Sequence, residues 1–211
     1  MKNKEVFSNV YRKELWGKEL NSNFFSGVGS RGILANKFIE YVSLFINNHS
    51  DIKNIVDIGC GDFYVSEKIL KNIEYENYCG IDVVDELIIF NNKKYANEKI
   101  KFLCFDITTN DIPKGDLCII RQVLQHLCNY DIHKIISNLK NKFKYILVTE
   151  HVYILPKFYN FDQPRSEHVY RLWNQSGVYL NKSPFNLQTK EVLSIDITNK
   201  EAIKTFLIEN L

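Results

Sequence analysis

Apolar runs alternate with amphipathic stretches between residues 53 and 150. Five short apolar runs predict β-strands: "NIVDI", "NYCGID", "IKFLCFD", "DLCII" and "KYILVTE". Between them, apolar residues at helical spacing predict one helix over 65–73 and another over 132–139. Strands that alternate with helices in this way predict a parallel sheet with right-handed crossovers.

The two flanks of this region have different patterns. Aromatic clusters and a glycine-rich turn precede a run over 34–46 whose apolar residues have helical spacing. Three of the four prolines fall after residue 150, which predicts an irregular segment, and "KEVLSIDI" followed by "IKTFLIEN" predicts a closing hairpin. No linker-like stretch divides the chain, so we predict one domain over 1–211. Its parts are an N-terminal lid and helix (1–50), a core (53–150), a substrate-recognition insertion (151–190) and the closing hairpin (191–211).

The composition predicts a packed domain, because 45% of the residues are hydrophobic and 25% are charged. The net charge of +2 argues against a broad surface for nucleic acid. No apolar run reaches the roughly 18 residues that span a membrane, and the N-terminal stretch lacks the apolar centre of a secretion signal. The five cysteines form no CxxC pair, so we expect reduced thiols, no metal site and a cytoplasmic location.

A glycine turn, "VDIGCGD", joins the first predicted strand of the core to the helix that follows it. Gly59 and Gly61 would allow the backbone to approach a ligand, and both a dinucleotide and S-adenosylmethionine bind at such a turn. A dinucleotide motif has a third glycine where this chain has Tyr64. Asp57 and Asp62 flank the turn and would repel a pyrophosphate. They favour S-adenosylmethionine, which has a cationic sulfonium and amine.

The next strands also end in acidic residues. Asp82 ends the second strand, where a carboxylate can accept hydrogen bonds from both ribose hydroxyls. Asp106 follows the third strand, where it can accept a hydrogen bond from an adenine amino group. The fourth strand runs into "RQVLQHL", which we expect to lie under the methionine part of the cofactor and to face the substrate. Each of these residues is a weak signal alone. The prediction depends on their occurrence at the ends of four successive strands.

The segments "VDIGCGD", "GIDVV", "FDIT" and "DLCIIRQVLQHL" resemble the class I (Rossmann-like) S-adenosylmethionine-dependent methyltransferases, in particular small bacterial enzymes that act on small molecules. The resemblance implies an α/β fold with a doubly wound, mostly parallel seven-stranded sheet. It also implies an antiparallel C-terminal hairpin, helices on both faces and an N-terminal helical lid. The residues that it assigns to the cofactor are Asp57, Gly59, Gly61, Asp82, Val83, Asp106, Ile107 and Arg121, the last through its backbone.

Methyl transfer to an alcohol requires a base, and our catalytic candidates are His126, Gln122 and His151, with Glu150 as a candidate substrate contact. His126 follows the fourth strand and is the preferred base, because an imidazole titrates near neutral pH. Gln122 lies four residues earlier and would share a helical face with it, where it could orient a substrate. Glu150 and His151 close the fifth strand and could act as a base or as polar substrate contacts. For each of these residues, a packing or loop-anchoring role is the alternative.

The two flanking segments contain further candidates. In "WGKELNSNFFSGVGSRG", Ser30 could hold the methionine carboxylate of the cofactor and Trp16 could close over it as a lid. The alternative is an aromatic plug with a tight turn that starts the helix. After the fifth strand, Arg165, Arg171 and Tyr179 could bind a sugar or a phosphate. Arginines that only neutralise surface carboxylates are the alternative there.

These observations predict a methyltransferase that uses S-adenosylmethionine on a small polar acceptor. The preferred acceptor is a hydroxyl of a saccharide or of a phosphorylated, hence anionic, metabolite. The alternatives are N-methylation of a small amine, methylation of RNA or protein, a catalytically idle cofactor-binding subunit and an enzyme that uses NAD. Nucleic acid and membranes are not expected partners, and the sequence makes no prediction of the oligomeric state.

Overall fold

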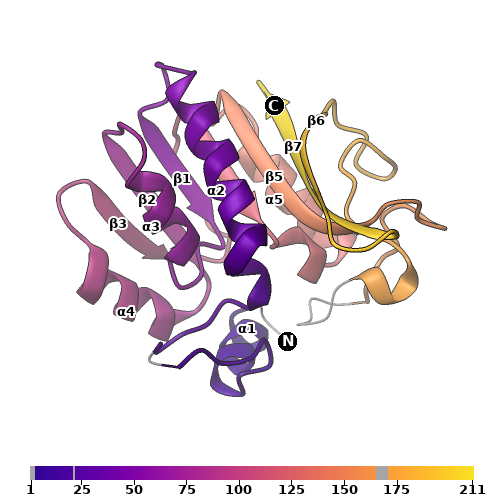
Figure 1. Cartoon of the computed structure of the whole chain (residues 1–211), viewed down its shortest axis with the longest axis horizontal. Helices are drawn as coiled ribbons and strands as arrows, with labels where there is room; N and C mark the ends of the chain where they lie inside the picture. The colour runs from indigo at the N-terminus through magenta and orange to yellow at the C-terminus, as the bar shows by residue number, and fades with distance from the viewer. Residues whose placement is uncertain (1–2, 21, 165–170) are drawn as a thin grey trace.

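The structure is a computed structural model, and it describes residues 3–20, 22–164 and 171–211 (Figure 1). The helices, with η for 3-10 helices, are α1 (Asn3–Arg12), η1 (Val28–Ser30), α2 (Gly32–Asn47), α3 (Tyr64–Leu70), α4 (Asp85–Tyr95), η2 (Leu124–His126), α5 (Asn129–Leu139) and η3 (Arg171–Asn174). The strands are β1 (Asn54–Ile58), β2 (Asn77–Asp82), β3 (Ile100–Cys104), β4 (Leu117–Arg121), β5 (Tyr145–Tyr153), β6 (Lys190–Asp196) and β7 (Glu201–Glu209).

The strands form one seven-stranded sheet in the order β3-β2-β1-β4-β5-β7-β6. The first five strands in this order are parallel, and β7 pairs antiparallel with both β5 and β6. The chain leaves β1 towards β2 on one side and later returns to β4 on the other side. The carboxyl ends of β1 and β4 therefore form a topological switch point, where ligands bind in such sheets. The predicted α/β fold with its antiparallel hairpin is confirmed.

Alternating side chains of the strands separate the core into two layers. Cys118 and Ile120 of β4 point to the layer that contains α5, whereas Leu117 and Ile119 point to the layer that contains α2 and α3. Figure 1 shows α2 crossing one face of the sheet and α5 behind the other. The sheet is covered on both faces, which explains why its central parallel strand β4 is apolar from Leu117 to Ile120. No helix within the described ranges is long and apolar enough to cross a membrane.

The fifth strand is longer than the sequence pattern indicates. β5 continues to Tyr153 because β7 pairs with it along its whole length, beyond the last residues that pair with β4. Glu150 pairs with Lys204 of β7, and His151 pairs with Ile203. We expected Glu150 and His151 to lie together at the end of the strand. They are inside it, so their side chains point to opposite faces of the sheet.

Candidate active site

A cavity of about 620 Å³ lies at the carboxyl ends of β1, β2 and β4. Its walls include the glycine turn, the loop after β3, the segment after β4, and parts of α1 and of residues 15–30. The cavity wall contains every residue predicted to bind the cofactor and every predicted catalytic residue: Trp16, Ser30, Asp57, Gly59, Gly61, Asp82, Val83, Asp106, Ile107, Arg121, Gln122, His126 and His151. The structure thus brings together residues from across two thirds of the chain.

The glycine turn requires glycine for two separate reasons. Gly59 and Gly61 have φ values of +71° and +54°, in the left-handed region that side chains disfavour. A Cβ atom on Gly61 would also lie 2.4 Å from the Ser26 hydroxyl, and one on Gly59 would lie 2.3 Å from a methyl group of Val123. Fully buried Asn91 donates a hydrogen bond to the Gly61 carbonyl at 2.8 Å and supports the turn from below.

Asp82 is held at the end of β2 by two backbone amides. Its Oδ2 accepts a hydrogen bond from the Gly61 amide at 3.2 Å, and its Oδ1 accepts one from the Val84 amide at 3.1 Å. Each oxygen keeps a second lone pair. Burial raises the pKa of Asp82 to about 6. A carboxylate with two fixed oxygens beside a bare backbone turn suits the adjacent hydroxyls of a ribose.

The other two predicted carboxylates have local partners as well. Asp57 is buried, and its Oδ2 accepts hydrogen bonds from the hydroxyls of Ser66 and Tyr78 at 2.5 and 2.7 Å. Asp57 therefore anchors α3 and β2 in addition to lining the cavity. Asp106 accepts hydrogen bonds from the amide and the hydroxyl of Thr108 through Oδ1. This turn leaves its second carboxylate oxygen for a ligand at the loop after β3.

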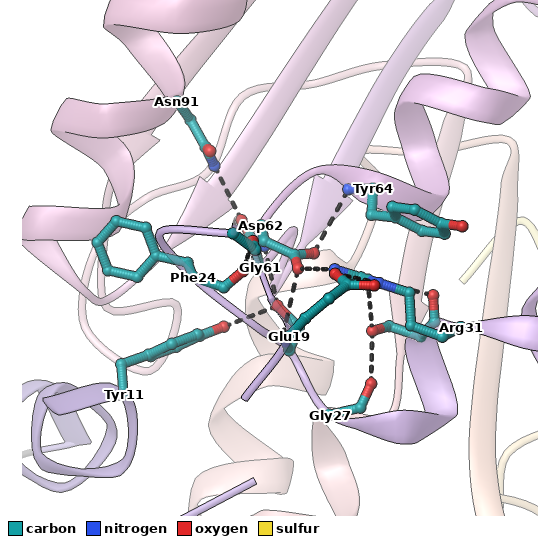
Figure 2. Close-up of polar contacts among 12 residues, drawn as sticks. Tyr11, Glu19, Phe24, Gly27, Arg31, Gly61, Asp62, Tyr64 and Asn91 are labelled. Carbon is teal, nitrogen blue, oxygen red and sulfur yellow. Dashed lines mark hydrogen bonds and ion pairs between the residues drawn. The ribbon is translucent and has the colours of Figure 1, made fainter. Parts of the chain in front are cut away.

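Asp62 links the N-terminal segment to the glycine turn, as Figure 2 shows. Its Oδ2 lies 2.6 Å from Arg31, whose guanidinium also pairs with Glu19. The Asp62 amide donates a hydrogen bond to the Ser26 hydroxyl at 2.9 Å, and the Tyr11 hydroxyl lies 3.0 Å from the same oxygen. Asp62 thus ties residues 26 and 31 of the N-terminal segment to the glycine turn. The sequence contains no local signal for this pairing, because Arg31 and Asp62 are far apart in it.

Aromatic rings close the cavity on the side of α1. The ring of Trp16 lies 5.3 Å from the imidazole of His126, 5.5 Å from Tyr11 and 6.2 Å from Phe7. These rings lie beside His126 on the cavity wall, in a position that a lid would need, and the lid role of Trp16 stays a prediction. The Ser30 hydroxyl also faces the cavity, where it donates a hydrogen bond to the Gly27 carbonyl at 2.6 Å and accepts one from Arg31 at 2.9 Å.

The segment after β4 is not the helix that the sequence pattern suggests. Gln122 has a left-handed backbone, with φ of +56°, and its side chain lies under Gly29. The prediction that Gln122 and His126 share a helical face is therefore wrong. A helical face requires continuous right-handed backbone between the two residues, and the chain turns sharply at Gln122 to leave the sheet.

Gln125, which no sequence motif marks, lies against His126 and limits the hydrogen bonds that the imidazole can make. The side-chain Oε1 of Gln125 accepts a hydrogen bond from the His151 amide at 2.9 Å. Since a backbone amide can only donate, the orientation of the Gln125 amide group is settled, and its Nε2 lies 3.3 Å from Nε2 of His126. An amide nitrogen also only donates, so Nε2 of His126 accepts this bond. The arrangement favours a neutral His126 with its proton on Nδ1.

His151 lies beside a hydrogen-bond acceptor, whereas His126 lies beside a donor. The Nε2 atom of His151 lies 3.3 Å from a carboxylate oxygen of Glu201 in β7. Burial lowers the pKa of His151, and Glu201 opposes this effect by stabilising the imidazolium. The two imidazoles on the cavity wall thus have different neighbours: an amide donor for His126 and a carboxylate for His151. Among the parts of the chain that the structure covers, no group of three or more His, Cys, Asp or Glu side chains could hold a metal ion.

No protein-family model matches the chain. A curated relative, malonyl-[acyl-carrier protein] O-methyltransferase 2 of Ilyobacter polytropus, is 28% identical over 94 residues. The match covers 43% of this chain and only 36% of that relative.

Solved structures with a similar fold include the N-methyltransferase NodS of Bradyrhizobium japonicum with S-adenosyl-L-homocysteine bound. It has a TM-score of 0.62 and 14% identity, over 94% of this chain and 98% of NodS. An S-adenosylmethionine-dependent methyltransferase of Clostridium acetobutylicum has a TM-score of 0.58 and 16% identity, over 83% and 91% of the two chains. This chain has the class I methyltransferase fold. The bifunctional kinase-methyltransferase WbdD is also similar, with a TM-score of 0.60 and 16% identity over 86% of this chain and 40% of WbdD.

Within this methyltransferase fold, three predicted substrate contacts have structural roles. Glu150 is fully buried, and its carboxylate accepts hydrogen bonds from the amides of Val123, Leu124 and Gln125 at 2.9 to 3.3 Å. It points away from the cavity because Glu150 and His151 are successive residues of β5, whose side chains alternate between the two faces of the sheet. Glu150 therefore shapes the loop that carries His126 and does not line the cavity.

Arg171 and Tyr179 are the other two, and both are buried. The Arg171 guanidinium donates hydrogen bonds to the Leu127 carbonyl at 2.5 Å and to the Phe161 carbonyl at 3.0 Å. The Tyr179 hydroxyl donates to the Tyr153 carbonyl at 2.9 Å. They hold the irregular segment against the sheet instead of facing the cavity. Arg165 lies outside the described residues.

Proposed function

We propose that this protein binds S-adenosylmethionine and transfers its methyl group to an oxygen atom of a small acceptor. The observation that supports this most directly is the meeting of the glycine turn and Asp82 in a cavity at the switch point of the sheet. When bound, the cofactor supplies an electrophilic methyl group on a cationic sulfur. The similarity to NodS, which was solved with S-adenosyl-L-homocysteine, supports this choice of cofactor.

The cofactor half of the cavity has the groups that such a ligand needs. Asp82 would accept hydrogen bonds from the ribose hydroxyls, and the loop after β3 with Asp106 and Ile107 would contact the adenine. Gly59 and Gly61 would let the backbone approach the ligand. Four aspartates line the cavity, at positions 57, 62, 82 and 106, which favours a cationic ligand over a pyrophosphate.

In the acceptor half, a histidine would remove the proton of the acceptor hydroxyl, and aromatic side chains would exclude water. His151 is the better base of the two histidines, because Glu201 stabilises its protonated form while the Gln125 amide favours neutral His126. His126 would orient the acceptor under the aromatic lid formed by Trp16 and its neighbours. Gln122 remains a proposed contact on the cavity wall.

The acceptor is proposed as a hydroxyl of a small uncharged molecule such as a saccharide. The curated relative is named an O-methyltransferase, which supports oxygen over nitrogen. The buried role of Arg171 removes one cation that a phosphorylated acceptor would need, and Arg121 is the only Lys or Arg among the described residues that line the cavity.

Calorimetry with S-adenosylhomocysteine and with NAD tests the cofactor, and mass spectrometry with a panel of hydroxyl and amine acceptors tests the transfer. We expect binding of S-adenosylhomocysteine alone and a mass increase on a hydroxyl acceptor. His151→Gln should reduce the rate more than His126→Gln, and by about 100-fold. Failure to bind S-adenosylhomocysteine would refute the proposal. Tight binding without transfer to any acceptor would favour an idle cofactor-binding subunit instead.

A further inference from the structure

Arg121 is the last residue of β4, and its side chain lines the cavity on the face of the sheet that α2 covers. One guanidinium nitrogen donates a hydrogen bond to the Gly29 carbonyl at 2.6 Å, and the group lies 5.1 Å from the centre of the Phe38 ring. Its Nε is buried and has no hydrogen-bond partner among the residues that the structure describes. The residue is thus partly exposed on the cavity wall, with one hydrogen bond to the protein and further guanidinium donors that a ligand could take.

A guanidinium that is largely removed from water and has few partners is unfavourable unless an anion joins it. Burial lowers the pKa of Arg121 to about 10, and the attraction of Asp57 and Glu150 only partly offsets this. Neither carboxylate pairs with Arg121: Asp57 accepts bonds from Ser66 and Tyr78, and Glu150 accepts bonds from three backbone amides. No carboxylate of the described residues therefore pairs with Arg121. A ligand in the cavity could supply the missing anion.

We propose that the guanidinium of Arg121 binds the carboxylate of the methionine part of S-adenosylmethionine, which rests on the proposed function above. The sheet order places β2 and β4 on opposite sides of β1. Asp82 and Arg121, at the ends of those two strands, are thus separated by two strand spacings, or about 10 Å. An extended methionine chain on its ribose has a length of this order. Asp82 at one end would bind the ribose and Arg121 at the other would bind the carboxylate.

Arg31 is the competing cation near the cavity, and it is already occupied. Its guanidinium pairs with both Glu19 and Asp62, which hold it in the network of the lid. The cavity wall also contains four aspartates, which would repel a carboxylate unless a cation offset them. Arg121 is the cation in a position to do so. It would contribute through its side chain, in addition to the backbone contact that the family resemblance implies.

Calorimetry with two ligands tests this assignment. S-adenosylhomocysteine contains the amino-acid carboxylate, whereas 5′-methylthioadenosine has the same nucleoside and sulfur without the amino acid. We expect Arg121→Met to weaken S-adenosylhomocysteine by about 10- to 100-fold and 5′-methylthioadenosine by less than about threefold. Arg121→Lys retains the charge and should lose less affinity for S-adenosylhomocysteine than Arg121→Met.

Arg31→Met is the matched control, because it removes an arginine that only organises the lid. It should weaken both ligands by the same factor. An equal loss for both ligands in Arg121→Met would show that Arg121 is only structural, and no loss for either would also overturn the assignment. If Arg121→Met does not fold, the same comparison with Arg121→Lys and Arg121→Gln decides the question. If the parent protein binds neither ligand, the proposed function fails, which is a different result from a loss confined to the variants.

Discussion

The proposed cofactor half and the proposed acceptor half of the cavity are built in different ways. The cofactor half comes from residues 57 to 122, where successive strands of one sheet end side by side. The acceptor half combines α1 and Trp16 from the start of the chain with His126, His151, Trp173 and Ile203. Its residues come from a helix, a loop after β4, the longest strands and an irregular segment.

This difference shows how each half is stabilised. The cofactor half depends on backbone amides and positive φ angles, which a few residues of local sequence determine. The acceptor half depends on ring contacts and on ion pairs between distant segments, such as His151 with Glu201, whereas the Arg31–Asp62 pair joins the lid to the cofactor half. Substitutions in the first half should therefore affect cofactor binding strongly. Substitutions in the second half should affect the lid, the acceptor and the rate.

The largest effect is expected for Gly61→Ala. The new Cβ would lie 2.4 Å from the Ser26 hydroxyl, which would displace the lid from the glycine turn. Affinity for S-adenosylhomocysteine in calorimetry should fall by about 100-fold. Gly32→Ala is the control, because Gly32 also has positive φ, +61°, but no atom within 4 Å of its Cβ position. It should cost about 1–2 kcal/mol of unfolding free energy with affinity nearly unchanged; equal affinity losses would contradict the steric explanation.

Asp82→Asn should weaken S-adenosylhomocysteine by about 10- to 30-fold at pH 7.5, because two charge-assisted hydrogen bonds to the ribose are lost. The pKa of Asp82 is raised to about 6, so the carboxylate takes up a proton as the pH falls through 6. Affinity of the parent protein should therefore decrease below pH 6, and that of Asp82→Asn should not. Titrations at pH 5 to 8 measure both, and a flat parent profile would argue against ribose recognition by Asp82.

Asp62→Ala and Glu19→Ala separate the two carboxylates that pair with Arg31. The Asp62 side chain is 7% exposed and the Glu19 side chain is 41% exposed, so solvent screens only the second pair well. Asp62→Ala should reduce cofactor affinity by about tenfold and make the segment before η1 more sensitive to protease. The reason is that Arg31 loses the less exposed of its two carboxylate partners. Glu19→Ala should change affinity by less than about twofold. The reverse ranking would show that the lid is held elsewhere.

Glu150→Gln should alter how stability depends on pH. Burial raises the pKa of Glu150 to about 8, whereas the unfolded chain has an ordinary glutamate. The folded state then binds more protons than the unfolded state, so stability decreases as the pH rises from about 5 to 8. Denaturant unfolding should show a decrease of about 3–4 kcal/mol in the free energy of unfolding across this range in the parent, and a smaller one in Glu150→Gln. Equal slopes would mean that Glu150 is ionised in the folded protein.

The smallest effect separates the two tryptophans. The Trp16 ring lies against His126 at a tilt, whereas Trp173 is 78% exposed at the edge of the cavity. Trp16→Phe should raise the acceptor KM by about two- to fivefold, because part of an aromatic contact is lost. Trp173→Phe should leave it nearly unchanged. Steady-state kinetics with the best acceptor of the panel measures both KM values. A larger effect at Trp173 would indicate that the acceptor binds nearer to the mouth of the cavity.

The sequence by itself determined the class of fold and most of the cavity wall. Apolar runs with helices between them imply parallel strands, and parallel strands bring their carboxyl ends to one edge. Gly59, Gly61, Asp82 and Asp106 could therefore be assigned to one site from their positions in the chain, and the structure places them there. Local pattern is sufficient here, because each of these residues lies directly at or after the end of its own strand.

Only the tertiary structure decided which side chains face that cavity. Glu150 and His151 are adjacent in sequence, yet their side chains point to opposite faces of the sheet, because both lie inside β5 where it pairs with β7. The pairs Arg31–Asp62 and His151–Glu201 join segments that no periodicity relates. Such contacts depend on how distant elements pack. The pattern of hydrophobic residues predicts which side chains are buried, but it does not predict which residues they contact. The sequence pattern likewise could not predict the environment of Arg121. Its Nε is buried by segments that come together only in the folded protein.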